Sequence, residues 1–360
     1  MNKESKYLVI CTFLLTIIGL FMIYSASSIW AKYRFNDSFH FMKYQLIYVL
    51  ISYIILFIIT KINYHNWKKN SNIILFMCFI LLILVLIPGI GTLKNGSRSW
   101  FSLGLISMQP SEFAKIGLII FLAKYLSNNQ NNMKSIIKGV FPILLIICLI
   151  LFFIMLEPDF GSAFVIALTL IIIIFASGVK MSFFTIGGLI GLLGIVLLII
   201  IAPYRLQRIF AFLNPWSDPL GSGYQIIQSL YAIGPSGIFG LGYGNSIQKQ
   251  FYLPEPQNDF ILAIIAEELG IVGIIIVVGL FLSICYITIK ISMKQEDLFA
   301  KYLSFGLGIQ IILQALLNMC VVVGLIPVTG VTLPFLSYGG SSLLVSMISI
   351  GIIINIANHQ

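Results

Sequence analysis

The chain has 360 residues, of which 59% are hydrophobic and only 9% are charged. This composition excludes an ordinary soluble domain and predicts a polytopic helical membrane protein. The net charge of +9 would suit a nucleic-acid-binding protein, but in a membrane protein it usually reflects Lys and Arg in cytoplasmic loops. We therefore expect membrane lipid, and no nucleic acid, among the partners.

The first apolar run, over residues 7–24, is too long for the core of a secretory signal, so we interpret it as an uncleaved first span. Nine more runs of spanning length follow it. The sequence thus predicts one integral membrane domain over residues 1–360, all-α and polytopic, with ten transmembrane helices and both termini on one side. The later spans are expected near residues 43–60, 72–88, 110–126, 139–156, 162–178, 183–202, 259–289, 300–326 and 339–357.

The acidic residues decide the predicted orientation. With the N- and C-termini in the cytoplasm, Lys and Arg favour the inner side only weakly. Of the twelve acidic residues, however, only Glu4, Glu296 and Asp297 then face the cytoplasm. The outer face carries nearly all the mixed charge, which is typical of a polar reaction or binding site.

The five cysteines indicate no metal site. All of them fall inside apolar runs, without the CxxC or Cys/His spacing of a zinc site. We expect buried free thiols and no disulfide framework. The residues concerned are Cys11, Cys78, Cys148, Cys285 and Cys320.

One predicted loop is long, the extracellular segment of about residues 203–258 between spans seven and eight. It carries Arg205 and Arg208, the turn-rich NPWSDPLGSG at 214–223, an amphipathic stretch at 223–230 and then several glycines. Because structureless loops of this length are uncommon, we expect short helices and turns over the outer face. The glycines lack the GxxxxGK[ST] pattern of a nucleotide loop and are better explained by turns and close packing.

Two polar clusters lie at the outer ends of spans four to six. The first runs from GSRSW, which contains Arg98, into QPSEFAK, which contains Gln109, Glu112 and Lys115. Glu112 and Lys115 are one helical turn apart and share a face, and just inside a membrane such a pair favours a water-filled cavity. The second cluster, EPD at 157–159, is equally consistent with a tight acidic turn and with part of a site.

A segment broken by Pro and Gly, PVTGVTLPFLSYGGSS at 327–342, enters the last predicted span. Irregular backbone at membrane depth is tolerated only beside protein or a water-filled cavity. We therefore expect this segment, with Ser337, to line the outer site.

The stretch FYLPEPQNDFILAIIAEELG at 251–270 is the one around which the chain is organised. Its two prolines keep the backbone extended, Asn258 suits an N-cap, and an apolar helix is expected from Asp259 to about Thr288. This arrangement puts the Asp259 carboxylate at the mouth of a span, with Glu267 and Glu268 about 12 Å deeper. Either these acids serve a function or Asp259 only caps the helix and the Glu pair only forms salt bridges.

At these residues the chain closely resembles the SEDS family, whose members are RodA, FtsW and SpoVE, over nearly its whole length. The NPW and SxQK motifs and the short tails are more similar to FtsW and SpoVE than to RodA. Two departures are Gln257-Asn258, where His-Thr or Gln-Thr is usual, and Leu262, where Phe is usual. The motifs that carry the resemblance appear in the expected order: YSAS, GSRSW, QPSEFAK, PYRLQRI, NPWSDPLGSGYQ, GNSIQK, YLPEPQNDF, EELG and LPFLSYGGSS.

The resemblance implies a peptidoglycan glycosyltransferase that polymerises lipid II at the outer face of the bacterial cytoplasmic membrane. It also implies a class B penicillin-binding protein as partner, with other division or sporulation proteins and a septal location. Whether the setting is vegetative division or sporulation stays open. Two other functions remain as alternatives, a lipid II flippase and a non-catalytic division scaffold.

An inverting polymerisation of a lipid-linked sugar pyrophosphate needs a base and cationic stabilisation of the leaving group. We assign Asp259 as the base; the helix dipole would lower its pKa and burial would raise it, and the sequence does not decide between them. Lys115 and Arg98, supported by Arg205 or Arg208, are the expected pyrophosphate partners, and Glu112 would position Lys115. A divalent cation such as Mg²⁺ or Mn²⁺ could share the charge. The remaining candidates for substrate binding are Gln109, Lys249, Glu255 and Ser337.

Overall fold

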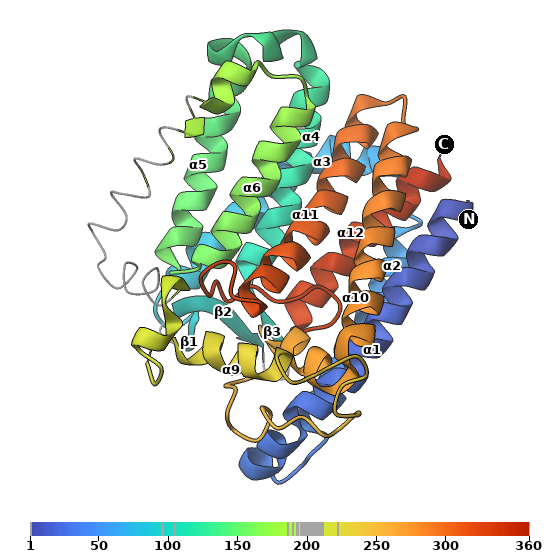
Figure 1. The fold of residues 1–360 in the computed structure, drawn as a ribbon. Helices are drawn as coiled ribbons and strands as arrows, with labels where there is room; N and C mark the ends of the chain where they lie inside the picture. The colour runs from blue at the N-terminus through green and yellow to red at the C-terminus, as the bar shows by residue number, and fades with distance from the viewer. Residues whose placement is uncertain are drawn as a thin grey trace.

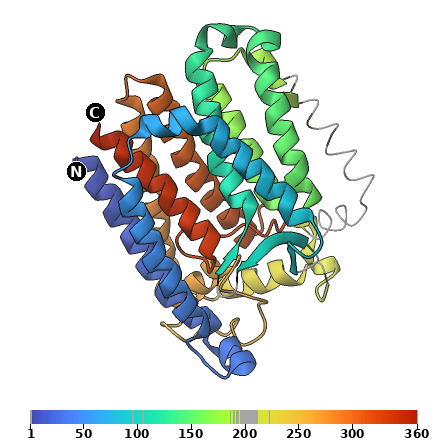
Figure 2. The same cartoon turned by 180° about the vertical axis from the view of Figure 1, so that it is seen from behind.

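The structure is a computed structural model that describes residues 2–94, 97–103, 106–185, 187–188, 191, 194, 212–221 and 223–359. It is a bundle of long helices whose two termini lie at the same end (Figures 1 and 2). The strands, α9 and the loop that precedes α10 lie at the opposite end. The α-helices are α1 (Lys3–Phe35), α2 (His40–Ile59), α3 (Tyr64–Leu86), α4 (Pro110–Asn128), α5 (Phe141–Leu156), α6 (Phe160–Ala176), α9 (Tyr224–Ile233), α10 (Ile261–Met293), α11 (Leu298–Val322) and α12 (Gly340–Asn358).

Seven helices in the described part of the chain are long and apolar enough to cross a membrane, and α6 is a shorter apolar helix. The predicted polytopic helical architecture is therefore confirmed. The count of ten spans stays a prediction, because the span expected near 183–202 lies largely outside the described residues. The prediction that every cysteine is buried was wrong for Cys148, a free thiol on the exposed face of α5.

A small antiparallel sheet, which the sequence did not predict, lies within the helical architecture. It consists of β1 (Thr92–Lys94), β2 (Ser97–Leu103) and β3 (Ile106–Met108), in the order β1-β2-β3. Thr92 pairs with Trp100, and Phe101 pairs with Met108. The sequence showed only a short polar cluster here, because strands this short carry little periodicity. The sheet pairs the backbone of the α3–α4 connection and packs β2 against α3 and α4.

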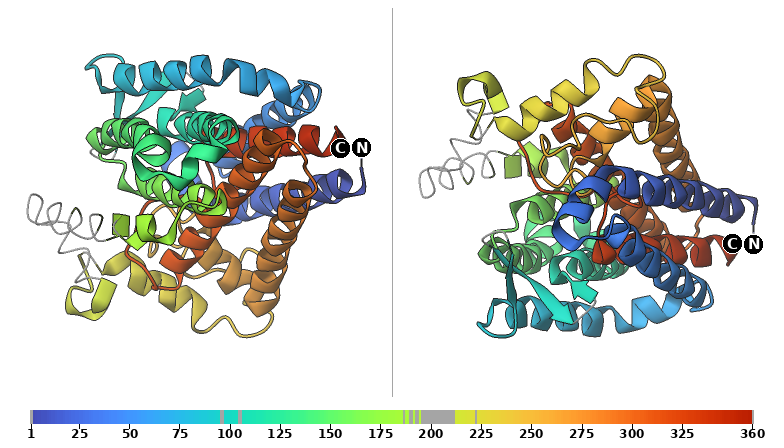
Figure 3. Two further views of the ribbon diagram at one scale, coloured as in Figure 1. Left: turned by 90° about the horizontal axis from the view of Figure 1, so that it is seen from above. Right: turned by 90° about the horizontal axis from the view of Figure 1, so that it is seen from below.

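Helix α12 lies at the centre of the bundle, and nearly all of its residues are buried. Small residues let its neighbours approach closely, as is usual between membrane helices. A Cβ added at Gly340 would lie 2.5 Å from the ring of Tyr48, and one added at Gly351 would lie 2.9 Å from Ile59. The termini are joined at its far end, where the Asn2 amide donates to Asn358 Oδ1 at 3.1 Å (Figure 3).

Helix α10 is not the continuous helix that the sequence predicted. It begins at Ile261 rather than Asp259, its N-cap position is Phe260, and it breaks at Gly270, where φ is 65° and ψ is −158°. The glycine-rich loop fills the break. Leu241 and Gly242 donate their amides to the carbonyls of Glu267 and Glu268 at 2.9 and 3.0 Å. On the other side of the break, the amides of Ile271 and Val272 donate to the carbonyls of Gly237 and Ile238 at 3.1 and 3.2 Å.

The described part of the long loop folds as the sequence predicted, into short helices and turns. Besides α9 it contains the short helix η3 (Pro215–Ser217). Gly240 shows why glycine is needed here, since its φ is 74° and an added Cβ would lie 2.4 Å from the backbone of Glu268. The glycines therefore serve turns and close packing, as expected.

We predict that Gly270→Ala destabilises the protein. The φ of Gly270 is unfavourable for alanine, and an added Cβ would lie 2.4 Å from the carbonyl oxygen of Ile238. Gly279 in the same helix has open space around it, so Gly279→Ala is the matched control and should be neutral or stabilising by up to about 1 kcal/mol. Thermal unfolding in nanodiscs measures both. Equal melting temperatures for the two variants would contradict the role of the break.

Candidate functional site

The main chain around Asp259 is fixed by hydrogen bonds from two directions. Ser337 Oγ donates to the Asn258 carbonyl at 2.6 Å, and the Tyr338 amide donates to the Gln257 carbonyl at 2.9 Å. From α11, Asn318 Nδ2 donates to the Asp259 carbonyl at 2.7 Å. Ser337, a predicted substrate-binding residue, therefore acts here on the backbone next to Asp259, and the broken segment 327–342 lies against Asp259.

The Asp259 carboxylate is partly buried, and no described residue donates a hydrogen bond to it. The pKa of Asp259 is raised to about 6. Burial is the main cause, and the nearby negative charge of Glu255 is the second. Of the two effects considered from the sequence, burial is the one that acts on this pKa in the structure. A carboxyl group with this pKa is largely ionised at neutral pH and keeps lone pairs free to accept a proton.

Glu255 lies in the exposed loop just before Asp259. Its φ is 43°, and its Oε2 accepts a hydrogen bond from Asn258 Nδ2 at 2.8 Å. The bond joins Glu255 to the residue next to Asp259. Glu255 therefore influences Asp259 through its charge and through the loop that carries both residues.

Glu112 and Lys115 form a buried ion pair in the first turns of α4, with 2.7 Å between Lys115 Nζ and Glu112 Oε2. Lys115 Nζ also donates to Gln314 Oε1 on α11 at 2.8 Å. The predicted pairing of these two residues is confirmed. Because an ammonium group has three donors, one N–H of Lys115 has no acceptor among the described residues.

Gln109 and Asp159 connect the start of α4 with the start of α6. Asp159 Oδ2 accepts from Gln109 Nε2 at 2.8 Å and from Ser111 Oγ at 2.9 Å, and Asp159 Oδ1 caps α6 through the Ser162 amide at 3.1 Å. The Gln109 amide donates to Ser341 Oγ at the start of α12 at 3.0 Å. Gln109 therefore holds the mouth of the site together in this structure.

Glu157 is fully buried, and neither oxygen of its carboxyl group has a hydrogen-bond partner in the described part of the chain. Burial, with a smaller effect of the Asp159 charge, raises the pKa of Glu157 to about 9. Glu157 is therefore neutral at pH 7. The acidic turn at 157–159 thus contains a helix cap, Asp159, and a buried acid, Glu157.

Of the three arginines predicted to bind pyrophosphate, only Arg98 lies among the described residues. Arg98 lies on β2, partly buried, with its aliphatic chain against Gly91. Its Nε is buried without an acceptor among the residues that the structure describes. Arg205 and Arg208 lie outside the described residues.

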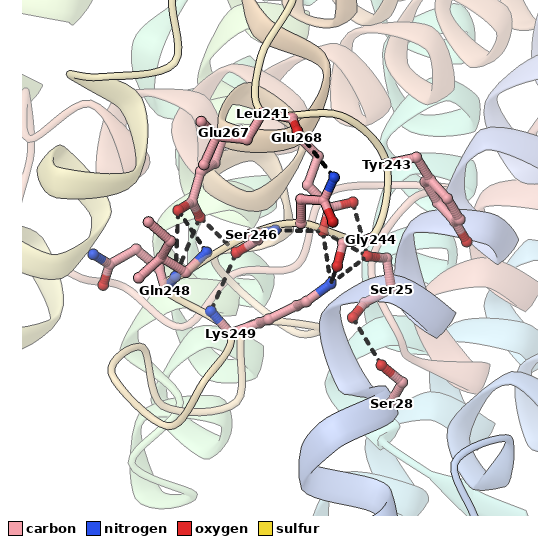
Figure 4. A network of polar contacts seen from close by, with 12 residues as sticks. Ser25, Ser28, Leu241, Tyr243, Gly244, Ser246, Gln248, Lys249, Glu267 and Glu268 are labelled. Carbon is pink, nitrogen blue, oxygen red and sulfur yellow. Dashed lines mark hydrogen bonds and ion pairs between the residues drawn. The ribbon is translucent and has the colours of Figure 1, made fainter.

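Lys249 belongs to a different cluster, shown in Figure 4. Its Nζ lies 2.9 Å from Glu268 Oε1, and it donates to Ser25 Oγ at 3.0 Å and to the Gly244 carbonyl at 2.6 Å. The side chains of Lys249 and Glu268 are only 4% and 0% exposed. All three donors of this ammonium group are thus occupied, and the substrate-binding role of Lys249 stays a prediction.

Glu267 and Glu268 on α10 anchor the loop that carries Lys249. Glu268 accepts from Ser25 on α1 at 2.6 Å, which joins α1 to α10. Glu267 accepts from Ser246 Oγ at 2.5 Å and from the Ile247 amide at 2.8 Å. Figure 4 shows the two carboxylates on opposite sides of Ser246. This geometry favours the structural interpretation of the pair.

Sequence analysis missed the buried amides of α11 that meet the site. Asn318 and Gln314 are both 1% exposed and reach Asp259 and Lys115. Their signal in the sequence was a four-residue spacing of amides within an apolar span, which also includes Gln310. Residues at this spacing share one face of a helix.

We predict that Lys249→Met destabilises the protein by about 3–5 kcal/mol, because it leaves the Glu268 charge buried and unpaired. The double variant Lys249→Met with Glu268→Gln is the control and should recover much of the loss. Unfolding in nanodiscs, followed by tryptophan fluorescence, measures both. A Lys249→Met variant as stable as the parent would contradict a structural role for the pair.

The chain is similar to known proteins over nearly its whole length. The family described as cell cycle protein, FtsW/RodA/SpoVE, matches residues 5–360. Stage V sporulation protein E of Bacillus subtilis (strain 168) is 50% identical over 353 residues, which cover 98% of this chain and 96% of that protein. The probable peptidoglycan glycosyltransferase FtsW of Geobacter sp. (strain M18) is 41% identical over 347 residues, covering 96% of this chain and 95% of that protein.

Solved structures agree with this similarity. A chain in a structure reported under "Structural coordination of polymerization and crosslinking by a peptidoglycan synthase complex" matches with a TM-score of 0.79 and 27% identity, covering 98% of this chain and 96% of that one. The rod shape determining protein RodA of Thermus thermophilus has the same fold, with a TM-score of 0.72, 24% identity and coverage of 98% and 95%. The chain therefore belongs to the FtsW/RodA/SpoVE family of cell cycle proteins, the SEDS family.

Proposed function

We propose that this protein is a peptidoglycan glycosyltransferase that polymerises lipid II into glycan strands at the outer face of the bacterial cytoplasmic membrane. The observation that carries the proposal is the Asp259 carboxylate, which is partly buried, has a fixed main chain and receives no hydrogen bond from a described residue. Several relatives named as probable peptidoglycan glycosyltransferases support the reaction class.

In the proposed reaction, Asp259 takes the proton from the 4-hydroxyl of the acceptor sugar. The freed oxygen attacks the anomeric carbon of the donor, and the bond from that carbon to the pyrophosphate oxygen breaks with inversion from α to β. The leaving pyrophosphate is stabilised by Lys115 and Arg98, with Arg205 or Arg208, while Glu112 and Gln314 orient Lys115. Gln109 and Glu255 complete the proposed substrate-binding set, to which Lys249 and Ser337 contribute only indirectly, through the loop and the backbone that they hold.

A divalent cation is not needed to balance this reaction. The described residues include no group of three His, Cys, Asp or Glu side chains close enough to hold a metal ion. The oxygens of Asp159 already accept hydrogen bonds from Gln109, Ser111 and Ser162. The proposed steps are carried by the chain's own side chains, and a divalent cation such as Mg²⁺ or Mn²⁺ is proposed only as an addition that would share the charge of the pyrophosphate.

The partner, orientation and location follow from the proposed reaction. Lipid II is presented at the outer leaflet, so the end of the bundle that carries Asp259 faces outward and the joined termini face the cytoplasm. We propose a class B penicillin-binding protein as the partner that cross-links the new strands, with location at the division or sporulation septum. The similarity to a chain from a peptidoglycan synthase complex supports a partnered enzyme.

Reconstitution tests the function directly. The purified protein is placed in proteoliposomes with its penicillin-binding partner and labelled lipid II, and glycan chains are separated by gel electrophoresis. We expect polymer that lengthens with time. Transbilayer movement of lipid II without polymer would instead support a flippase, and neither activity would support a scaffold.

We predict that Asp259→Asn abolishes polymerisation in this assay. The change is nearly isosteric, so folding and partner binding should survive, but an amide does not take up a proton at working pH. Loss of a positioned base costs about a hundredfold to ten-thousandfold in rate. Glu255→Gln in the same loop is the control and should have the milder effect. Polymerisation by Asp259→Asn at close to the parent rate would rule out the base assignment.

We also predict an acid limb in the rate near pH 6. Asp259 acts as a base only when ionised, so the rate should fall as pH drops through its pKa of about 6. Glu255→Gln removes a neighbouring negative charge that raises this pKa, so the limb should move to lower pH. Asp37→Asn, on another outer loop where Asp37 pairs with Lys43, should leave the limb in place. A limb that moves upward in Glu255→Gln would contradict the assignment.

A further inference from the structure

Helix α11 presents a row of three buried amides toward the site. Gln310, Gln314 and Asn318 follow one another at intervals of four residues and are each 1% exposed. Buried amides in a membrane helix are costly unless they are hydrogen-bonded, which marks them as positions with a specific task. Two of the three are bonded to the proposed catalytic groups or to the backbone beside them.

Asn318 forms hydrogen bonds to two irregular backbone segments at once. Its Nδ2 donates to the Asp259 carbonyl at 2.7 Å and to the Val331 carbonyl at 2.8 Å. Val331 follows Gly330, whose φ is 73° and whose added Cβ would lie 3.8 Å from Asp259 Oδ2. A single amide thus fixes both the main chain of Asp259 and the segment that lies against its carboxylate.

Gln314, one turn away on α11, forms a hydrogen bond to Lys115, the proposed cationic group of the site. Its Oε1 accepts from Lys115 Nζ at 2.8 Å and from Gln310 Nε2 at 2.9 Å. Its Nε2 donates to the Thr332 carbonyl at 3.1 Å and to Ser342 Oγ at 3.3 Å. The amide accepts from the lysine with its oxygen and donates to the backbone with its nitrogen, so one side chain joins the two.

We propose that Gln314 and Asn318 are positioning residues that set the spacing between Lys115 and Asp259. Successive turns of one rigid helix, about 6 Å apart along its axis, anchor the cation and the base. An inverting transfer needs these groups on opposite sides of the same anomeric carbon, and small errors in such placement are costly. The proposal deepens the glycosyltransferase function proposed above and rests on it.

The first test compares Asn318→Leu with Asn355→Leu in the reconstituted polymerisation assay. Asn355 on α12 is a matched control, because it is a fully buried amide whose Nδ2 donates to one backbone carbonyl, that of Thr60, at 2.8 Å. It lies at the end of the bundle that carries the termini, about 20 Å along α12 from Ser342. We expect Asn318→Leu to lower kcat about 10- to 100-fold with little change in KM for the donor, and Asn355→Leu to change neither.

Equal kinetic effects of the two substitutions would overturn the role of Asn318. If Asn318→Leu does not insert into the membrane, the variant Asn318→Ser is used instead. The serine hydroxyl keeps one hydrogen-bond donor in a smaller side chain. Asn318→Ser should retain a larger share of kcat than Asn318→Ala. No difference between the serine and alanine variants would also count against the role.

The second test is a double-mutant cycle on Gln314 and Lys115, read as binding of undecaprenyl pyrophosphate to the protein in nanodiscs. Gln314 acts through Lys115 in this proposal, so Gln314→Leu should weaken binding severalfold in the parent and have no further effect beside Lys115→Met. Additive losses would overturn the positioning role of Gln314, as would unchanged binding in the single variant.

Because the second test measures binding rather than turnover, it separates the two proposals. A parent protein that makes no glycan from lipid II but shows the non-additive cycle would contradict the glycosyltransferase function and keep the coupling of Gln314 to Lys115. If the parent polymerises lipid II but the binding losses of Gln314→Leu and Lys115→Met are additive, the glycosyltransferase function stands and the coupling of Gln314 to Lys115 is rejected.

Discussion

The structure depends on one constraint, that polar groups buried among apolar helices must find partners within the chain. The break in α10 at Gly270 frees backbone carbonyls and amides, and the loop at 237–242 satisfies them from outside the helix. The irregular segment 327–342 is held in the same way by Asn318 and by the loop around Asn258. Irregular backbone is therefore concentrated at one end of the bundle, where it surrounds Asp259.

The same constraint divides the buried charges into two groups. Lys249 and Glu268 satisfy each other and, with Ser25, join α1 to α10, so their role in this structure is to hold elements together. Lys115 is also paired, with Glu112 and Gln314, but its third donor has no acceptor among the residues that the structure describes. Asp259 is the contrasting case, a carboxylate whose backbone is bound and whose side chain receives no hydrogen bond from a described residue. Fixed position with free lone pairs is what a general base requires.

Much of the candidate site was predictable because its signals are local. Glu112 and Lys115 pair as their spacing of one helical turn implied. The prolines around Glu255 and the Pro/Gly-broken segment that contains Ser337 indicated irregular backbone, and the two segments meet beside Asp259. The extra sheet at 92–108 was not predictable, since strands of three to seven residues have too little periodicity to stand out. The break in α10 was also missed, because a single Gly in a long apolar run is compatible with an unbroken helix.

The sequence by itself determined a polytopic helical membrane protein, the family motifs in their order, and a carboxylate at the mouth of a span. Those features follow from composition and local spacing, which do not depend on long-range contacts. Only the tertiary structure decided that burial raises the pKa of Asp259, and that Lys249 meets Glu268 rather than Asp259. Only the fold brought Gln314 to Lys115 and Asn318 to Asp259, which are 199 and 59 residues apart in the chain. Such contacts are set by how the helices pack, and the spacing of residues along one helix does not encode which neighbour they meet.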